Sequence, residues 1–303
     1  MINFVNRKYI ESFDEKQSPE LIFANYLESC NEMDTLAIEQ YKRMDRGWGK
    51  SESANRLYKN LIDFRNNFGK FDRLINSIVK EDICDIFNKK TNFEELKLDG
   101  FQINFILGWD LCEGCLSVVD DVIHVNILLE KYMDVENLQM AIEVTIIHEL
   151  LHGYRDIKNK LSNDQRMGDQ IIEEGLACMY CAEIYKPSKV FSELILPNGI
   201  SLINSDTMKT HADKFKMSFN RKCDKYTRKL VYLGHKRLDI PNGIGYYYGI
   251  LSIMDLIVNK KLKIEELVMM DSGKIKAHIN AFEGLNFDYE KLEMQWRHQN
   301  GES

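Results

Sequence analysis

The segment that organises this sequence is His148-Glu149-Leu150-Leu151-His152. In an α-helix, residues four apart lie about 40° apart around the axis and one turn apart along it, so both imidazoles can reach one ion. Glu149 projects roughly 100° from His148 and can approach a water on that ion. About 0.01 such matches are expected by chance in a chain of this composition. The segment therefore predicts a metal site on a helix.

The residues before this segment support the prediction of a helix. They are mainly apolar and include Val135, Leu138, Ala141, Ile142, Val144, Ile146 and Ile147. Two histidines and a glutamate in such a buried helix would cost free energy unless they were paired or bound a metal. Metal-assisted hydrolysis uses a Lewis acid, a water that it acidifies and a carboxylate that takes the water's proton. A pair of hydrogen-bonded core histidines is the structural alternative.

A third ligand must come from further along the chain, because a catalytic zinc site takes three protein ligands and leaves the fourth position to water. The metzincin extension would place Gly and His three and six residues after His152, where this chain has Arg155 and Lys158. The other route uses a glutamate on a following helix, and Glu173 and Glu174 are both available. Adjacent carboxylates on a regular helix cannot both face one ion, so we expect only one of them to bind.

The chain resembles the gluzincin metallopeptidases in two motifs: His148, Glu149 and His152 match the zinc helix, and the E-G-L-A segment beginning at Glu174 matches the third-ligand segment. It is most similar to the bacterial predicted zinc-dependent proteases, over residues 101–248 in outline. The resemblance implies that His148, His152 and Glu174 bind Zn²⁺ and that Glu149 is the general base. It also implies hydrolysis of peptide bonds, with a peptide or protein as the substrate.

The same resemblance favours Glu174 over Glu173 as the third ligand. It also contains one departure, because some gluzincins have an aspartate four residues after the ligand glutamate, where this chain has Cys178. That aspartate orients the first histidine. Glu173 or backbone carbonyl groups are expected to take over this role here.

A tyrosine is predicted to stabilise the oxyanion of the tetrahedral intermediate, for which such sites use a Tyr, His or Arg donor besides the metal. Residues 241–249 open a predicted helix that carries three consecutive tyrosines, Tyr246 to Tyr248. A similar Gly-Tyr-Tyr segment follows the third ligand in the predicted proteases. We favour Tyr247, with His235 and Arg155 as reserves; packing is the alternative role of a tyrosine at a helix start.

Alternation with a period of two predicts two strands, separated by a turn at Cys112–Cys115. The alternating apolar residues are Phe101, Ile103, Phe105 and Leu107 in the first strand and Ile123, Val125, Ile127 and Leu129 in the second. The resemblance to gluzincins makes the second strand, Asp121–Glu130, a candidate for the edge strand that pairs with an extended substrate. An interior strand is the alternative. His124 precedes the metal helix and is not expected to be a ligand.

The rest of the sequence is predicted to be mainly helical. Ser18 before Pro19 is typical of a helix start. Apolar residues at helical spacing predict further helices over residues 53–67 and 72–87. Asp134 is the expected N-cap of the metal helix.

These elements predict an α+β fold that is mostly helical, with a small sheet packed on the zinc helix, as in gluzincins. We expect two parts. Residues 1–95 form a helical N-terminal region, and residues 96–303 form a zincin-like metallopeptidase domain.

Composition limits the partners and the location. The net charge of −7 and a pI near 5.6 argue against a nucleic-acid partner. No run approaches the roughly 20 apolar residues of a membrane span. Seven cysteines without a recognisable export signal predict a cytoplasmic protein with free thiols. The pairs Cys112/Cys115 and Cys178/Cys181 have zinc-ligand spacing, but small buried side chains are the simpler interpretation.

Two alternatives to a peptidase stay open. A non-catalytic binding module would keep the metal for stability, with Cys178 or His235 as a fourth protein ligand in place of water. A hydrolase of a non-peptide amide would use the same residues on another substrate.

Overall fold

The computed structural model describes residues 1–31, 35, 37–39, 42, 49–89, 96–109, 114–159, 166–186, 220–223, 240, 243–279 and 289–299. The chain groups into two compact units, Met1–Ile157 and Lys158–Ser303, each of which is described by itself. This grouping does not test the predicted division into residues 1–95 and 96–303, which stays a prediction.

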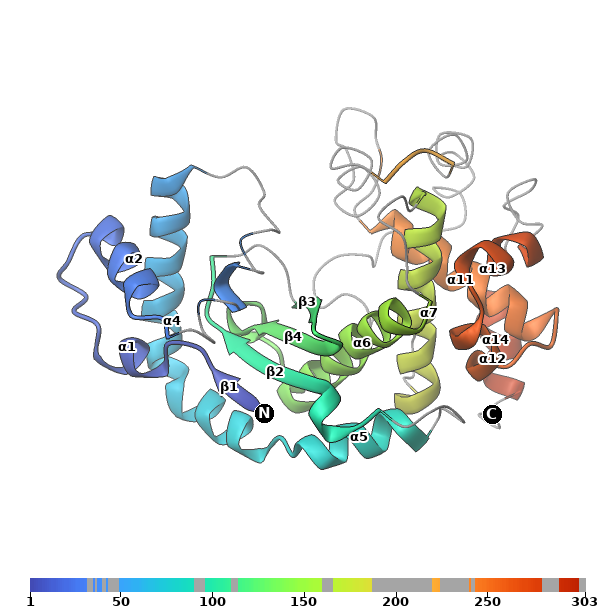
Figure 1. The fold of residues 1–303 in the computed structure, drawn as a ribbon, viewed down its shortest axis with the longest axis horizontal. Coiled ribbons are helices and arrows are strands. Elements are labelled where there is room, and N and C mark those ends of the chain that lie inside the picture. Colours follow the sequence, from blue (N-terminus) through green and yellow to red (C-terminus); the bar gives the residue numbers. More distant parts are fainter. Residues whose placement is uncertain are drawn as a thin grey trace. The chain divides into compact units, whose positions relative to one another are not determined.

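The first unit contains a four-stranded mixed sheet with the order β1-β2-β4-β3 (Figure 1). Its strands are β1 (Ile2–Phe4), β2 (Phe101–Ile106), β3 (Gly114–Val119) and β4 (Val122–Leu128). The pairs β1–β2 and β2–β4 are parallel, and β3 pairs with β4 in the antiparallel direction. Helices and a small sheet in one chain confirm the predicted α+β class.

The edge strand beside β4 is β3, which the sequence analysis did not predict. The predicted strand Asp121–Glu130 corresponds to β4 and lies inside the sheet, between β2 and β3. The expectation that it is an edge strand is therefore wrong, and the interior alternative holds. The predicted turn at Cys112–Cys115 is also corrected in its second half, because Cys115 already belongs to β3.

The two faces of the sheet differ in polarity because side chains alternate along a strand. One face carries fully or almost fully buried apolar residues from β2 and β4: Phe101, Ile103, Phe105, Ile123, Val125 and Ile127. The opposite face carries a polar row. In that row Gln102 Nε2 donates to Asn104 Oδ1 (2.8 Å), and Asn104 Nδ2 donates to Asn126 Oδ1 (2.9 Å).

Between β1 and β2 the described chain is mostly helical. Its named helices are α1 (Arg7–Ser12), α2 (Pro19–Glu28), α4 (Lys50–Ser77) and α5 (Lys80–Lys89). Ser18 caps α2 as predicted, since its side chain accepts a hydrogen bond from the Leu21 amide. The two helices predicted over residues 53–67 and 72–87 are instead divided between α4 and α5, with the break after Ser77.

Helix α6 (Leu138–Asn159) carries His148, Glu149 and His152. It starts later than predicted, because Asp134 lies in a turn after the 3₁₀ helix η2 (Leu129–Tyr132). Its backbone approaches β4 closely at Gly153. A Cβ atom there would lie 2.9 Å from Ile123 Cγ1, closer than real Cβ atoms come to other heavy atoms.

The described part of the second unit is helical apart from short connections. Its named elements are α7 (Met167–Tyr185), α11 (Ile244–Val258), α12 (Ile264–Met269), α13 (Ser272–His278) and α14 (Tyr289–Gln299). Helices α7 and α11 cross with their backbones in contact. A Cβ on Gly175 would lie 2.6 Å from Gly249 Cα, and a Cβ on Gly249 would lie 2.9 Å from Gly175 Cα.

None of the described helices combines the length and the apolar composition that crossing a membrane requires.

Candidate metal centre

Helix α6 places His148 and His152 on one side, as the four-residue spacing predicts. The helix is held by apolar residues on its other sides, and Ile146, Ile147, Leu150 and Leu151 are fully buried. The two histidines and Glu149 are only half-buried. Polar side chains on an otherwise buried helix therefore gather where the helix remains accessible.

The Nε2 atoms of the two imidazoles face each other. These atoms are 3.0 Å apart, and the ring planes are inclined by 79°. Two Zn–N bonds of about 2.0–2.1 Å at a tetrahedral angle would separate the nitrogens by roughly 3.3 Å. The observed separation is within a few tenths of an ångström of that value, so the pair fits a zinc ion.

Glu149 lies on a neighbouring side of α6 and faces the first residue of the edge strand. A Cβ on Gly114 of β3 would lie 3.2 Å from Glu149 Oε1 and 3.3 Å from Glu149 Cγ. The carboxylate therefore lies directly against the main chain of β3. A substrate strand lying along that edge would pass close to a potential base.

Glu174 and Glu173 have different surroundings on α7. Glu174 is half-buried. Glu173 is 5% exposed, and its carboxylate accepts a hydrogen bond from the Ser272 hydroxyl at the start of α13. The side chain of Glu173 is thus engaged inside its own unit, which favours Glu174 as the residue available to a metal.

His148, His152 and Glu174 form a group that could hold a metal ion. One ligand atom from each lies within 4.8 Å of the others, and all three residues are half-buried. Two imidazoles and one carboxylate suit the borderline character of Zn²⁺. Within the described residues no other group of three His, Cys, Asp or Glu side chains is arranged in this way.

Cys178 takes the position at which an aspartate was considered. It is 2% exposed. Burial, with smaller contributions from the nearby Glu174 and Cys181, raises the pKa of its thiol well above the ordinary value. In the absence of a metal, Cys178 therefore stays a neutral thiol at pH 7.

The three tyrosines lie in the first turns of α11, which begins after Gly243, a residue with a φ of 76°. Tyr247 is 3% exposed and Tyr248 is fully buried, whereas Tyr246 is half-buried. Burial raises the pKa of Tyr247 to about 12. Its hydroxyl therefore keeps its proton throughout the neutral range and can act as a hydrogen-bond donor.

Arg155, His235 and Cys112 were also candidates for roles at a metal site. Arg155 is 1% exposed on α6. His235 and Cys112 lie outside the described residues. Glu143, one turn before His148 and Glu149 on the same helix, accepts a hydrogen bond from Gln139 Nε2 (2.9 Å).

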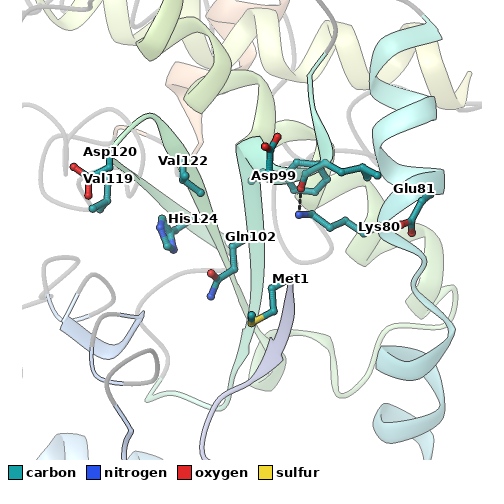
Figure 2. A pocket seen from close by; sticks show the side chains of 11 residues that line it. Met1, Lys80, Glu81, Asp99, Gln102, Val119, Asp120, Val122 and His124 are labelled. Carbon is teal, nitrogen blue, oxygen red and sulfur yellow. Dashed lines mark hydrogen bonds between the residues drawn. The ribbon is translucent and has the colours of Figure 1, made fainter.

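His124 lies on β4 and belongs to a different part of the first unit. Its neighbour Ile123 faces Gly153 of α6, so His124 points to the opposite face of the sheet. There it lines a pocket of about 740 Å³ together with Gln102 and Lys80 (Figure 2). Burial, with a smaller contribution from the chain's amino group, lowers the pKa of His124.

The cysteine pairs show no sign of a four-thiolate site in the part of the chain that the structure describes. Cys115, Cys178 and Cys181 are buried and form no disulfide, and none belongs to the metal-binding group. Small buried side chains were the simpler interpretation of their spacing.

Two glycines beside candidate site residues were not predicted to matter. In the first unit a Cβ on Gly114 would strike the side chain of Glu149, and in the second unit Gly175 follows Glu174 at the crossing of α7 and α11. A glycine directly after a proposed ligand is visible in the sequence, and so is the glycine after His152. The partner of each glycine is a tertiary contact and has no local signal.

A comparison with protein families adds evidence that is independent of this geometry. The family model described as "Predicted Zn-dependent protease (DUF2268)" matches residues 113–277. No curated protein matches the chain. Because the family match covers more than half of the chain, the chain belongs to this family of predicted zinc-dependent proteases.

Proposed function

We propose that this member of the predicted zinc-dependent protease family is a metallopeptidase that hydrolyses peptide bonds, of the gluzincin type. His148, His152 and Glu174 would hold Zn²⁺, and Glu149 would act as the general base. The observation that carries the proposal is the pair of Nε2 atoms on α6, which lie 3.0 Å apart, within hydrogen-bond distance of each other and close to the spacing of two zinc ligands. The grouping of the three ligand atoms within 4.8 Å supports it.

Each residue has a distinct role in this proposal. When bound, the zinc ion would supply a Lewis acid that acidifies a water molecule and polarises the scissile carbonyl group. Glu149 would accept the proton of the attacking water and donate it to the leaving amine. Its half-buried position beside an edge strand leaves it accessible to both.

Tyr247 would donate a hydrogen bond to the oxyanion of the tetrahedral intermediate. A pKa of about 12 supports this role, because the hydroxyl is protonated at any working pH near neutrality. Replacing Tyr247 by Phe should lower kcat about tenfold or more and change KM little. Tyr246→Phe is the matched comparison, since this half-buried neighbour is the more accessible of the two.

The substrate would be a peptide or protein bound as an extended strand along β3. Among the described strands β3 ends the sheet, so one row of its main-chain groups has no partner in another described strand. Such groups bind a peptide main chain with little selection for side chains. The contact between Gly114 and Glu149 supports β3 as the binding edge.

Glu149→Gln tests the proposal. The purified protein, loaded with zinc, is incubated with a mixed peptide pool, and its metal content is measured in parallel. The variant should keep the metal and lose roughly a hundredfold or more in turnover, because glutamine cannot accept the proton.

Equal cleavage by both proteins would contradict the mechanism. Metal binding without cleavage in either protein would favour the non-catalytic binding module. Cleavage of simple amides but not of peptides would favour a non-peptide substrate.

A further inference from the structure

We propose that Gly114 and Thr145 are positioning residues for Glu149. Together they form a wall beside its carboxylate and hold it in one orientation, and Tyr132 fixes Thr145 in turn. The proposal rests on the proposed function, because it assumes that Glu149 is the general base.

Space, rather than backbone conformation, requires glycine at position 114. Gly114 is not among the described residues with a positive φ. A Cβ atom there would lie 2.8 Å from Thr145 Cγ2 and 3.2 Å from Glu149 Oε1. Carbon atoms in contact are normally about 3.5–4.0 Å apart. These two side chains therefore occupy the space that a Cβ at position 114 would need, and any larger residue must displace one of them.

Thr145 cannot easily yield to such a residue because its hydroxyl group is bonded on two sides. Thr145 Oγ1 donates to the Ala141 carbonyl oxygen (3.0 Å) and lies 2.6 Å from the hydroxyl of Tyr132. A threonine hydroxyl has one hydrogen, so Tyr132 is the donor in the second bond. Tyr132 is 2% exposed. These bonds fix the side-chain torsion of Thr145 and with it the methyl group that faces Gly114.

Glu149 is the side chain whose orientation these contacts would limit. It lies one helical turn after Thr145 and contacts the same side of Gly114, so its carboxylate is bounded by the helix and the strand. A general base must come within about 3.2 Å of the proton that it takes. A misplacement of about 1 Å can cost roughly a hundredfold in rate.

The first test is Gly114→Ala, measured in the zinc-loaded protein with the peptide pool. We expect kcat to fall about a hundredfold while KM changes by no more than about twofold, because the base moves but the substrate still binds. The zinc content should stay that of the wild type. Gly69→Ala is the control: Gly69 is exposed on α4, a Cβ there meets nothing within 4 Å, and wild-type kcat is expected.

The second test is rescue by Thr145→Ser. This change removes the Cγ2 atom that a Cβ at position 114 would strike, and it keeps the hydroxyl bonded to Tyr132. In the double variant Gly114→Ala/Thr145→Ser, kcat should recover at least about tenfold relative to Gly114→Ala alone. Because relief of the clash would also restore folding, the free energy of unfolding of both variants is measured by urea denaturation, and kcat is compared at equal folded protein.

The outcomes separate this inference from the proposed function. If wild type and Glu149→Gln cleave equally, the proposed function fails and the positioning role fails with it. If cleavage depends on Glu149 but Gly114→Ala matches Gly69→Ala, only the positioning role is overturned. Loss of zinc or of folding in Gly114→Ala, without rescue by Thr145→Ser, would also overturn it.

Discussion

Helices α6 and α7 are alike in one respect: on each, a proposed metal ligand is followed directly by a glycine at a close packing contact. On α6, Gly153 follows His152 and faces a side chain, that of Ile123 on β4. On α7, Gly175 faces the backbone of a second helix at Gly249. The same residue type therefore solves two different packing problems.

The difference lies in what can move. An isoleucine side chain can change rotamer or shift by a few tenths of an ångström, at a modest cost. The backbone of α11 can move away from α7 only if the whole helix moves, and α11 is almost entirely buried. We therefore expect the α7 contact to tolerate a methyl group less well than the α6 contact.

Gly175→Ala should have the largest effect on stability. The added Cβ would lie 2.6 Å from Gly249 Cα, so the two helices must separate. We expect the free energy of unfolding to fall by about 3 kcal/mol, the upper part of the usual range for overpacking. Urea denaturation measures this. A loss below that of Gly153→Ala would reverse the comparison between the two contacts.

Ser272→Ala should have the next largest effect and tests a second feature of α7. It removes the hydroxyl that donates to the buried carboxylate of Glu173. We expect a loss of about 2 kcal/mol, as for a hydrogen bond to a charged group. Zinc content should be unchanged, because Glu173 is not a proposed ligand. Loss of zinc in Ser272→Ala but not in Glu174→Gln would exchange the roles of the two glutamates.

The sequence predicted the local parts of this molecule and missed the parts that depend on distant contacts. Ser18 caps its helix, and the alternation in β2 and β4 is clear, because these signals lie within a few residues. Strand β3 was missed because Gly114 and Ser117 interrupt its apolar alternation. β1 has three residues, too few for a period to show.

The long helix α4 was divided wrongly for a related reason. The two predicted helices leave residues 68–71 between them, and Gly69 lies there, but glycine costs an exposed helix only about 1 kcal/mol. Buried Phe64 and Phe71 on either side keep the helix packed through that point. Packing therefore overrode a weak local preference.

The candidate site divides in the same way. The spacing of His148 and His152 is a property of one helix and could be predicted, and their Nε2 atoms are close together. The choice between Glu173 and Glu174 depends on Ser272, which is far along the chain, so the residues alone left it open. The contact of Gly114 with Glu149 likewise joins a strand to a helix and has no sequence period.

Gly153→Ala is expected to cost less than either change on α7, about 1 kcal/mol, because Ile123 can move aside in part. The Cβ would lie 2.9 Å from Ile123 Cγ1. Ile123→Ala costs stability by itself, but it removes the obstruction. The loss in the double variant should therefore be smaller than the sum of the two single losses, as a double-mutant cycle measures. Strict additivity would mean that Ile123 does not limit this contact.

Gly69→Ala has the smallest expected effect, and its sign is opposite. Gly69 lies inside α4, is exposed, and would direct a Cβ into open space. Alanine restricts the unfolded chain and favours the helix, so the free energy of unfolding should rise by about 0.5–1 kcal/mol. The comparison of α6 with α7 depends on this sign. If Gly69→Ala also destabilised the protein, the losses at Gly153 and Gly175 could not be attributed to the atoms opposite them.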